Sequence, residues 1–234
     1  MAPHPKTPRS ARAPTRGGRL ALSAGLVAAL AIVLAAAFAG RDGRETGPRD
    51  APAALPVLWS VPAFTLTDST GRAFSSAELD GKVWVACFIF TRCSDTCPQM
   101  TRRLRAVEDA IKAVPGLADS VRLVSFSVDP ARDKPRDLEE YAAANGADRD
   151  LRVFLTGEKG AVAALSRDGF KLAVGEDPAG SEDVVHSDRF ALVDREGRLR
   201  SYYSPLTETK DLQRLVEDLK RLAREGSREG SAEQ

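Results

Sequence analysis

The pattern of apolar and polar positions in residues 62–224 predicts one domain in which short strands alternate with amphipathic helices. Residues 83–90 form a continuous apolar run, which indicates a strand buried on both faces of a sheet. Pro98 then opens a segment with apolar residues at helical spacing, which ends near residues 115–116. The apolar stripe of this predicted helix consists of Met100, Leu104, Val107 and Ile111.

The same order of elements is repeated in the next part of the chain. Residues 121–128 predict a second strand, and residues 135–145 predict a second helix. Residues 153–155 and 160–167 predict a further strand and a further helix. Alternation of this kind indicates an α/β domain, with a mixed sheet that carries helices on both faces.

A hairpin is predicted at the start of the domain. Residues 64–66 and 73–74 are strand-like and flank a turn that contains Gly71. A capped helical turn follows at residues 75–79. These elements precede the first buried strand, so we expect them to form an N-terminal hairpin extension of the main sheet.

A second hairpin and a helix are predicted to close the domain. Residues 184–193 and 199–203 are strand-like and are separated by a polar turn, and a helix follows over about residues 208–224. The apolar stripe of this helix is Leu212, Leu215, Val216, Leu219 and Leu222. A closing hairpin followed by a final helix is typical of a thioredoxin-like fold.

The first 39 residues have the pattern of a membrane anchor. Residues 1–19 contain five basic residues and no acidic residue, and residues 20–39 form an uninterrupted run of 20 uncharged residues. This run matches the ~20 residues that a helix needs to cross a bilayer core. Because basic flanks stay in the cytoplasm, we expect a cytoplasmic leader and a single transmembrane helix in a bacterial inner membrane. The domain would then face the periplasm or the cell exterior.

Two other interpretations of this N-terminal segment stay open. Residues 37–39 have the small-residue pattern of a signal-peptide cleavage site, and an Arg-rich, acid-poor leader is also typical of a mitochondrial presequence. We favour a retained anchor because the apolar run exceeds the ~7–15 residues of a signal-peptide core. Residues 40–61 are predicted to be a linker, and residues 225–234 a disordered tail.

The overall composition excludes several functional classes. The 234 residues have a net charge of +1 and 6% aromatic residues, which argues against a nucleic-acid-binding surface. Three cysteines are too few for a disulfide-built scaffold, and a domain of this size does not need one. The chemistry of the cysteines therefore has to be inferred from their positions.

Cys93 and Cys97 give the strongest functional signal in the sequence. They stand four residues apart, between a buried strand and a helix whose first turn is predicted to hold Pro98. Backbone N–H groups at a helix N-terminus stabilise thiolates, so we expect lowered thiol pKa values, with Arg92 acting in the same direction. A thiolate is both a soft metal ligand and a redox nucleophile. A purely structural disulfide is disfavoured, because closing so small a loop removes little entropy from the unfolded chain.

His186 is the second candidate. It is the single histidine of residues 62–224, because His4 belongs to the leader. We expect it to begin the strand that precedes the closing turn. In a thioredoxin-like topology that strand starts beside the loop after the first central strand, so His186 can meet the two thiols.

Two thiolates and one imidazole form a soft set of ligands, which suits Cu(I), zinc or an iron–sulfur centre. Structural zinc normally has four protein ligands, and iron–sulfur clusters usually have four thiolates. The domain offers no fourth cysteine or histidine except Cys87. By elimination, a copper ion is the favoured metal.

Three further residues are candidates to contribute to this site. Cys87 lies within the apolar run and is expected to pack in the core. Met100 lies one helical turn after Cys97, but its place on the apolar stripe favours packing over ligation. Asp129 follows the second strand and is a candidate either to orient His186 from outside the ligand set or to cap the next helix.

Three segments together resemble the Sco/SenC family of copper-binding thioredoxin-fold proteins. They are residues 88–98 with both cysteines, residues 127–130, and residues 186–194 beginning at His186. The resemblance covers nearly the whole domain. It implies a membrane-anchored copper metallochaperone that delivers copper to the binuclear copper site of cytochrome c oxidase, with Cys93, Cys97 and His186 as ligands.

The resemblance also implies partners: the copper-bearing subunit of cytochrome c oxidase, other copper carriers, and thioredoxin-like reductants. Cys87 departs from the family pattern, since bacterial relatives often have Asp there. Its thiol leaves an aberrant disulfide or a fourth soft ligand open.

A thiol–disulfide oxidoreductase that uses Cys93 and Cys97 as its catalytic redox-active pair is the alternative function. That chemistry needs no histidine, and it usually prefers the shorter C-x-x-C spacing. A peroxiredoxin-like pocket motif and a Gly-x-Ser-x-Gly nucleophile elbow are both absent from the sequence.

Overall fold

The computed structural model describes residues 54–94, 96–172, 175–176, 184–185, 187–208 and 210–229. The chain divides into two compact units, Met1–Ala53 and Ala54–Gln234, and the described residues all belong to the second. The predicted leader, the predicted anchor at residues 20–39 and His186 lie outside the described residues. Within the described part of the chain, no helix is long and apolar enough to span a bilayer.

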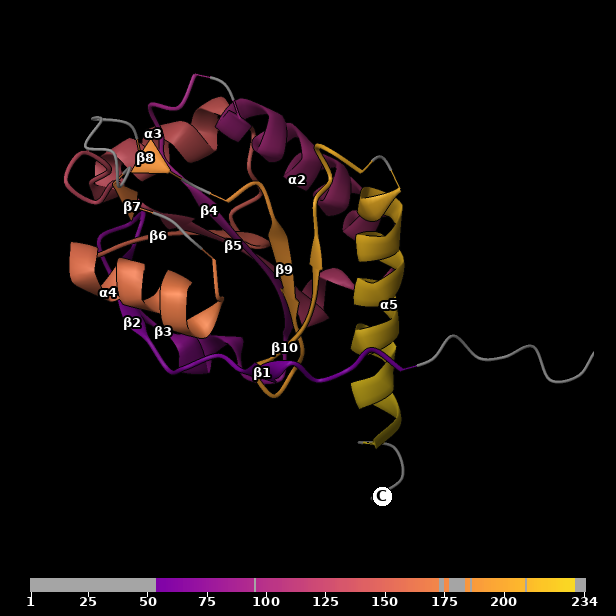
Figure 1. The fold of residues 1–234 in the computed structure, drawn as a ribbon. Helices are drawn as coiled ribbons and strands as arrows, with labels where there is room; N and C mark the ends of the chain where they lie inside the picture. Colours follow the sequence, from indigo (N-terminus) through magenta and orange to yellow (C-terminus); the bar gives the residue numbers. More distant parts are fainter. Residues whose placement is uncertain are drawn as a thin grey trace, which may run out of the picture. The chain divides into compact units, whose positions relative to one another are not determined.

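The main sheet has eight strands in the order β1-β10-β9-β4-β5-β6-β2-β3 (Figure 1). These strands are β1 Trp59–Ser60, β2 Thr65–Asp68, β3 Ala73–Ser75, β4 Val83–Ile89, β5 Val121–Ser127, β6 Arg152–Thr156, β9 Phe190–Val193 and β10 Arg198–Tyr203. Strands β4, β5 and β6 are parallel, whereas β9 runs antiparallel to β4. The prediction of a mixed sheet is therefore confirmed, and the hairpin of β2 and β3 extends its far edge.

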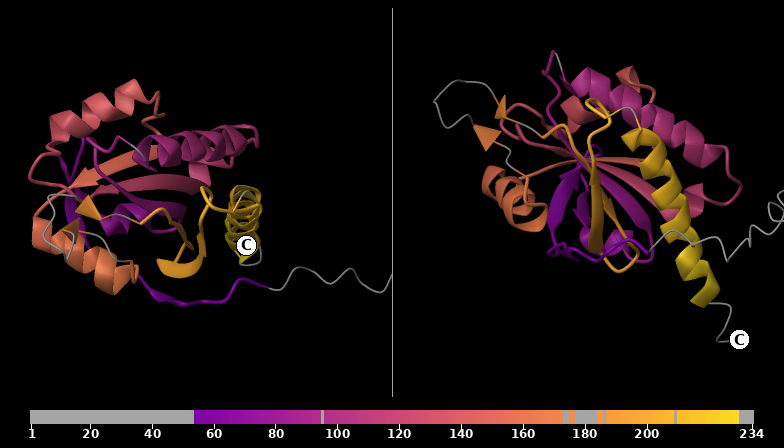
Figure 2. Two further views of the ribbon diagram at one scale, coloured as in Figure 1. Left: turned by 45° about the horizontal axis from the view of Figure 1, so that its top comes forward. Right: turned by 45° about the vertical axis from the view of Figure 1, so that its right-hand side comes forward.

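Helices cover both faces of the sheet, as the alternating pattern predicted (Figures 1 and 2). The helices are α2 Thr96–Lys112, α3 Pro135–Ala144, α4 Lys159–Ala164 and α5 Asp211–Glu229, with short helical turns η1 Ser76–Leu79, η2 Ala118–Ser120 and η3 Leu165–Gly169. Apolar side chains of α2, α3 and α5 share one core with the sheet. Those of η1, α4 and η3 share the core on the opposite face.

Strand β4 supplies both cores, because its side chains alternate between the two faces of the sheet. Val85, Cys87 and Ile89 belong to the core beneath α2, and Trp84 and Phe88 belong to the other. Every residue of β4 is buried, which confirms the prediction from its continuous apolar run.

Several predicted boundaries differ from the structure. The predicted strand 184–193 is wrong as one element: β8 Val184–Val185 pairs with β7 Gly175–Glu176 in a separate two-stranded sheet, and only β9 joins β4. The polar residues 186–189 separate two apolar ends of this segment, and the sequence does not reveal which strand each end will pair with.

The segments predicted as linker and tail also contain regular structure. Strand β1 lies within the predicted linker, where Trp59 pairs with Leu199 and its indole Nε1 donates a hydrogen bond to the Gly169 carbonyl at 2.8 Å. Helix α5 continues to Glu229, five residues past the predicted end at residue 224. Strand β1 and the last turns of α5 were not predicted, because the local sequence does not indicate the distant residues with which they pack.

Arg200 ties the start of the described chain to the closing hairpin. Its side chain is largely buried, its Nη1 lies 2.8 Å from Asp194 Oδ2, and its Nε donates to the carbonyls of Leu55 and Pro56. Arg198 pairs with the same carboxylate oxygen at 2.8 Å, but its side chain is 38% exposed. The two arginines therefore share one partner in different environments.

We predict that Arg200→Met lowers the free energy of unfolding by about 2–3 kcal/mol, because it removes the buried cationic partner of Asp194 and the side-chain donor to two carbonyls. The matched variant Arg198→Met should cost no more than about 1 kcal/mol, because solvent already screens that pair. Urea denaturation of both variants measures the difference. Equal losses would show that burial of the Arg200 pair contributes nothing.

Cys87 packs in the core, as predicted, with 1% of its surface exposed. Its sulfur lies 3.3 Å from Ser125 Oγ on the neighbouring strand. Burial raises the pKa of the Cys87 thiol to about 11, and the hydrogen bond to Ser125 and the charge of Arg152 oppose this rise. The thiol is therefore neutral in the folded protein across the physiological range.

The raised pKa of Cys87 predicts a loss of stability at high pH. Between about pH 9 and pH 11 the unfolded thiol releases its proton while the folded thiol keeps it, so the free energy of unfolding falls as the pH rises. In urea titrations, the stability difference between the parent and Cys87→Ala should shrink by up to about 1.4 kcal/mol per pH unit in this range. A difference that stays constant from pH 8 to pH 11 would contradict this assignment.

Candidate functional site

The two candidate thiols lie where β4 passes into α2. Strand β4 ends at Ile89, and Cys93 lies partly buried in the loop that follows. Cys97 is completely buried and is the second residue of α2, because the helix begins at Thr96, before Pro98. The thiols therefore occupy a loop and the first helical turn, not the loop alone.

Backbone hydrogen bonds fix the relation between the two cysteines. The Cys97 N–H donates to Cys93 Sγ at 3.3 Å, and the Cys93 N–H donates to the Phe90 carbonyl at 3.3 Å. The first N–H groups of a helix have no partner within the helix, so the Cys93 sulfur satisfies one of them. Cys87, Cys93 and Cys97 are all thiols in this structure.

The expected lowering of the thiol pKa is wrong for Cys97. Burial raises the pKa of this thiol far above its usual range, and the neighbouring thiols of Cys93 and Cys87 add to the rise. A backbone hydrogen bond from Phe90 acts in the opposite direction but is the smaller effect. Removal of the thiolate from water therefore outweighs the stabilisation that the helix N-terminus offers.

A buried carboxylate that the sequence analysis did not single out anchors this loop. Asp133, with 0% of its surface exposed, accepts hydrogen bonds from the Thr91 N–H at 3.0 Å and from Thr91 Oγ1 at 2.6 Å. Ser127 Oγ donates to the same carboxylate at 2.6 Å. The order of the strands could have indicated this contact. Thr91 and Asp133 follow the ends of two neighbouring parallel strands, so both lie at the same edge of the sheet.

Asp129 lies in the same turn but has a different partner. Its carboxylate pairs with Arg132 Nη1 at 3.1 Å, and its N–H donates to Ser127 Oγ. The capping interpretation is wrong for α3, because the N-cap of that helix is Lys134, whose N–H donates to Asp137. The suggested role of Asp129 towards His186 stays a prediction.

The structure brings together two of the three predicted ligands. Cys93 in the loop and Cys97 in the first turn of α2 are joined by a hydrogen bond from the Cys97 N–H to Cys93 Sγ, and His186 lies outside the described residues. Within the ranges that the structure describes, no three His, Cys, Asp or Glu side chains are grouped so that they could hold a metal ion. Met100 is fully buried in the core beneath α2, which confirms its packing role.

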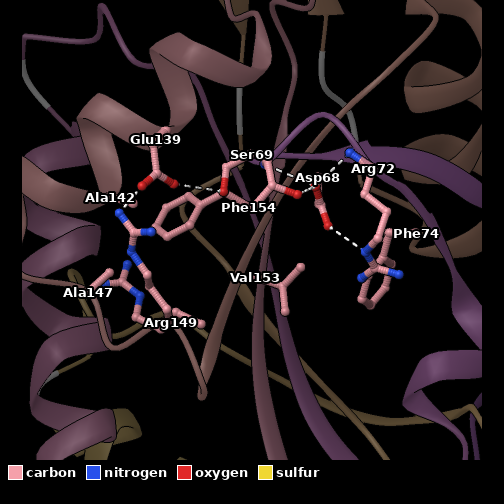
Figure 3. Close-up of a pocket in the computed structure, with 12 residues that line it drawn as sticks. Asp68, Ser69, Arg72, Phe74, Glu139, Ala142, Ala147, Arg149, Val153 and Phe154 are labelled. Atoms are coloured by element: carbon pink, nitrogen blue, oxygen red, sulfur yellow. Dashed lines mark hydrogen bonds and ion pairs between the residues drawn. The ribbon is translucent and has the colours of Figure 1, made fainter.

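A separate cavity of about 160 Å³ lies between the hairpin of β2 and β3, strand β6 and helix α3 (Figure 3). Its exposed arginines already have carboxylate partners: Arg72 pairs with Asp68 at 3.3 Å, and Arg149 pairs with Glu139. The cavity is lined by the first residues of β6, whereas the dithiol follows the last residue of the parallel strand β4. It therefore lies towards the other end of the sheet and is no part of this site.

Comparison with known proteins gives a consistent set of relatives. The SCO1/SenC family model matches residues 59–224. The SCO1 protein homolog of Bacillus subtilis is 35% identical over 155 residues, which cover 66% of this chain and 78% of the relative.

Solved structures of the same family have the same fold. BsSco, a member of the Sco family of cytochrome c oxidase assembly proteins in which a disulfide switch has been identified, is 33% identical with a TM-score of 0.63, and covers 72% of this chain and 96% of its own. Bradyrhizobium japonicum ScoI with copper bound is 28% identical with a TM-score of 0.57, and covers 70% of this chain and 99% of its own. The resemblance inferred from the three segments is confirmed, and the chain belongs to the SCO1/SenC family.

Proposed function

We propose that this protein is a copper metallochaperone that binds copper through Cys93, Cys97 and His186. Its cargo would be delivered to the binuclear copper site of cytochrome c oxidase. The observation that carries the proposal is the pair of thiols joined by the 3.3 Å hydrogen bond from the Cys97 N–H to Cys93 Sγ. Two adjacent sulfur ligands, one in the loop and one at the start of α2, suit a soft, low-coordination metal such as Cu(I).

The relatives support copper as the cargo. Bradyrhizobium japonicum ScoI is known with copper bound, and BsSco belongs to a family of cytochrome c oxidase assembly proteins. The copper-bearing subunit of that oxidase is therefore our proposed recipient. Other copper carriers and thioredoxin-like reductants are the proposed upstream partners.

The topology of β9 supports His186 as the third ligand. Ser187 and the two residues after it lead into Phe190, the first residue of β9. Because β9 runs antiparallel to β4, its first residue lies at the end of the sheet from which the cysteine loop emerges. A ligand just before β9 in the sequence thus has a short route to the dithiol.

The unequal burial of the two cysteines suggests how copper would be passed on. Cys97 has 0% of its surface exposed, whereas Cys93 is partly exposed in the loop. A ligand from a partner protein would reach the metal from the side of Cys93. We infer that transfer by ligand exchange begins with release of the Cys93 sulfur.

The proposed location follows from the N-terminal sequence. Residues 20–39 would anchor the chain as a single transmembrane helix in a bacterial inner membrane, with the basic residues 1–19 in the cytoplasm. The folded domain would then face the periplasm or the cell exterior.

Copper titration of the reduced full chain tests the proposal. We expect one Cu(I) per chain in competition with a chromophoric chelator, and an affinity loss of about 100-fold or more in His186→Ala, which corresponds to about 2.7 kcal/mol. Cys87→Ala is the matched control, because this thiol lies in the core beside Ser125, and it should bind copper like the parent. Equal affinities of the parent and His186→Ala would remove His186 from the site.

A thiol–disulfide oxidoreductase remains the second candidate, and the same unequal burial favours it. A partly exposed Cys93 can attack a partner's disulfide, and the adjacent Cys97 can resolve the mixed disulfide. This activity needs no metal and no histidine.

Reduction of a model disulfide by the metal-free chain separates the two functions. If the parent and His186→Ala both fail to bind copper, while the parent reduces the disulfide and Cys93→Ser does not, the oxidoreductase replaces the metallochaperone. Tight copper binding without disulfide reduction would exclude the oxidoreductase.

A further inference from the structure

Asp133 connects two loops that are 42 residues apart in the sequence. Its Oδ2 accepts from the Thr91 N–H at 3.0 Å, and its Oδ1 accepts from Thr91 Oγ1 at 2.6 Å. Ser127 Oγ donates to Oδ2 at 2.6 Å from the last residue of β5. Both carboxylate oxygens are thus engaged, and Thr91 is bound through its main chain and its side chain at once.

The contact continues from Thr91 to the dithiol through the main chain. Thr91 lies two residues before Cys93, between Phe90, whose carbonyl accepts from the Cys93 N–H at 3.3 Å, and the exposed Arg92. Cys93 Sγ in turn accepts from the Cys97 N–H. A displacement of Thr91 would therefore move the Cys93 sulfur relative to the start of α2.

Asp133 is itself held rigidly on the side of β5. Its N–H donates to the Asp129 carbonyl at 2.8 Å, and the Asp129 N–H donates to Ser127 Oγ at 3.2 Å. The next residue, Lys134, is the N-cap of α3. The end of β5 and the start of α3 thus hold the Asp133 carboxylate in place. A carboxylate held in this way can restrict the position of Thr91 in the cysteine loop.

The contact depends on the three hydrogen bonds that the Asp133 carboxylate accepts. Among the described residues, the donors to Asp133 are uncharged groups of Thr91 and Ser127. A buried carboxylate is costly unless hydrogen bonds compensate for lost hydration. A neutral side chain would avoid this cost, so the carboxylate is best explained by its capacity to accept all three hydrogen bonds.

We propose that Asp133 is a positioning residue of the copper site, which holds the Cys93 sulfur in register with Cys97 by fixing Thr91. This inference rests on the proposed copper function for its metal readout. It makes a separate statement about the metal-free dithiol, because the same geometry determines how readily Cys93 and Cys97 form a disulfide.

Asp68 provides a matched control in the same chain. It is also buried and accepts from the N–H and Oγ1 of one threonine, Thr70, at 2.9 and 2.6 Å. It organises the turn between β2 and β3 at the far edge of the sheet. Asp68 thus reproduces the threonine contact of Asp133 without any connection to the cysteines, although it has Arg72 as an additional, charged partner.

The experiment compares Asp133→Ala, Asp133→Asn and Asp68→Ala in the full chain. We expect Asp133→Ala to lower Cu(I) affinity by about 10- to 100-fold, the usual loss when a residue that orients a ligand is removed. The reduction equilibrium of Cys93 and Cys97 against glutathione should change by about tenfold, or about 30 mV. Asp133→Asn keeps one acceptor and should recover part of both losses, whereas Asp68→Ala should change neither readout.

If Asp133→Ala destabilises the protein as Asp68→Ala does but leaves copper affinity and the dithiol equilibrium unchanged, Asp133 is merely structural and the proposal is overturned. If Asp133→Ala does not fold, Thr91→Val decides the question with Thr70→Val as its control, since each removes one hydroxyl donor. If the parent binds no copper, the proposed function fails, and the dithiol equilibrium alone then supports or overturns the role of Asp133.

Discussion

Strand β4 is buried on both faces and paired along both edges, and the position of the dithiol depends on this constraint. Its register with β5 extends to the pair Ile89 and Ser127, and β9 pairs along the other edge. A slip of one residue would exchange the side chains of the two cores, which close packing does not allow. The end of β4 is therefore fixed, and the loop with Cys93 must emerge at this point.

The site shows two opposing effects on one thiol. The start of α2 offers N–H groups that favour a thiolate, yet the Cys97 side chain is packed beneath that helix and its pKa is raised. Cys97 is thus protonated in the described state, and Cys93 is the thiol that solvent or a partner meets first. Such an asymmetric pair suits stepwise ligand or disulfide exchange, in which one sulfur reacts before the other.

Buried aspartates organise the turns of this fold by the same physical means. Asp68 and Asp194 each accept main-chain N–H groups within a hairpin turn, as short carboxylate side chains commonly do. The Asp133 carboxylate accepts hydrogen bonds in the same way, but from Thr91, which is 42 residues away in the sequence and belongs to another loop. A buried carboxylate stabilises single turns elsewhere in the molecule, whereas Asp133 connects the cysteine loop to the end of β5.

The sequence by itself determined the α/β class, the buried strand β4, the closing hairpin and the candidate dithiol, because each depends on local periodicity or spacing. The tertiary structure alone decided the split of residues 184–193 into β8 and β9, the pairing of β1, the raised pKa of Cys97 and the contact of Asp133 with Thr91. These features depend on which distant segments pack together and how deeply they bury a group. The local sequence shows neither the packing partners of a segment nor the depth at which a side chain will be buried.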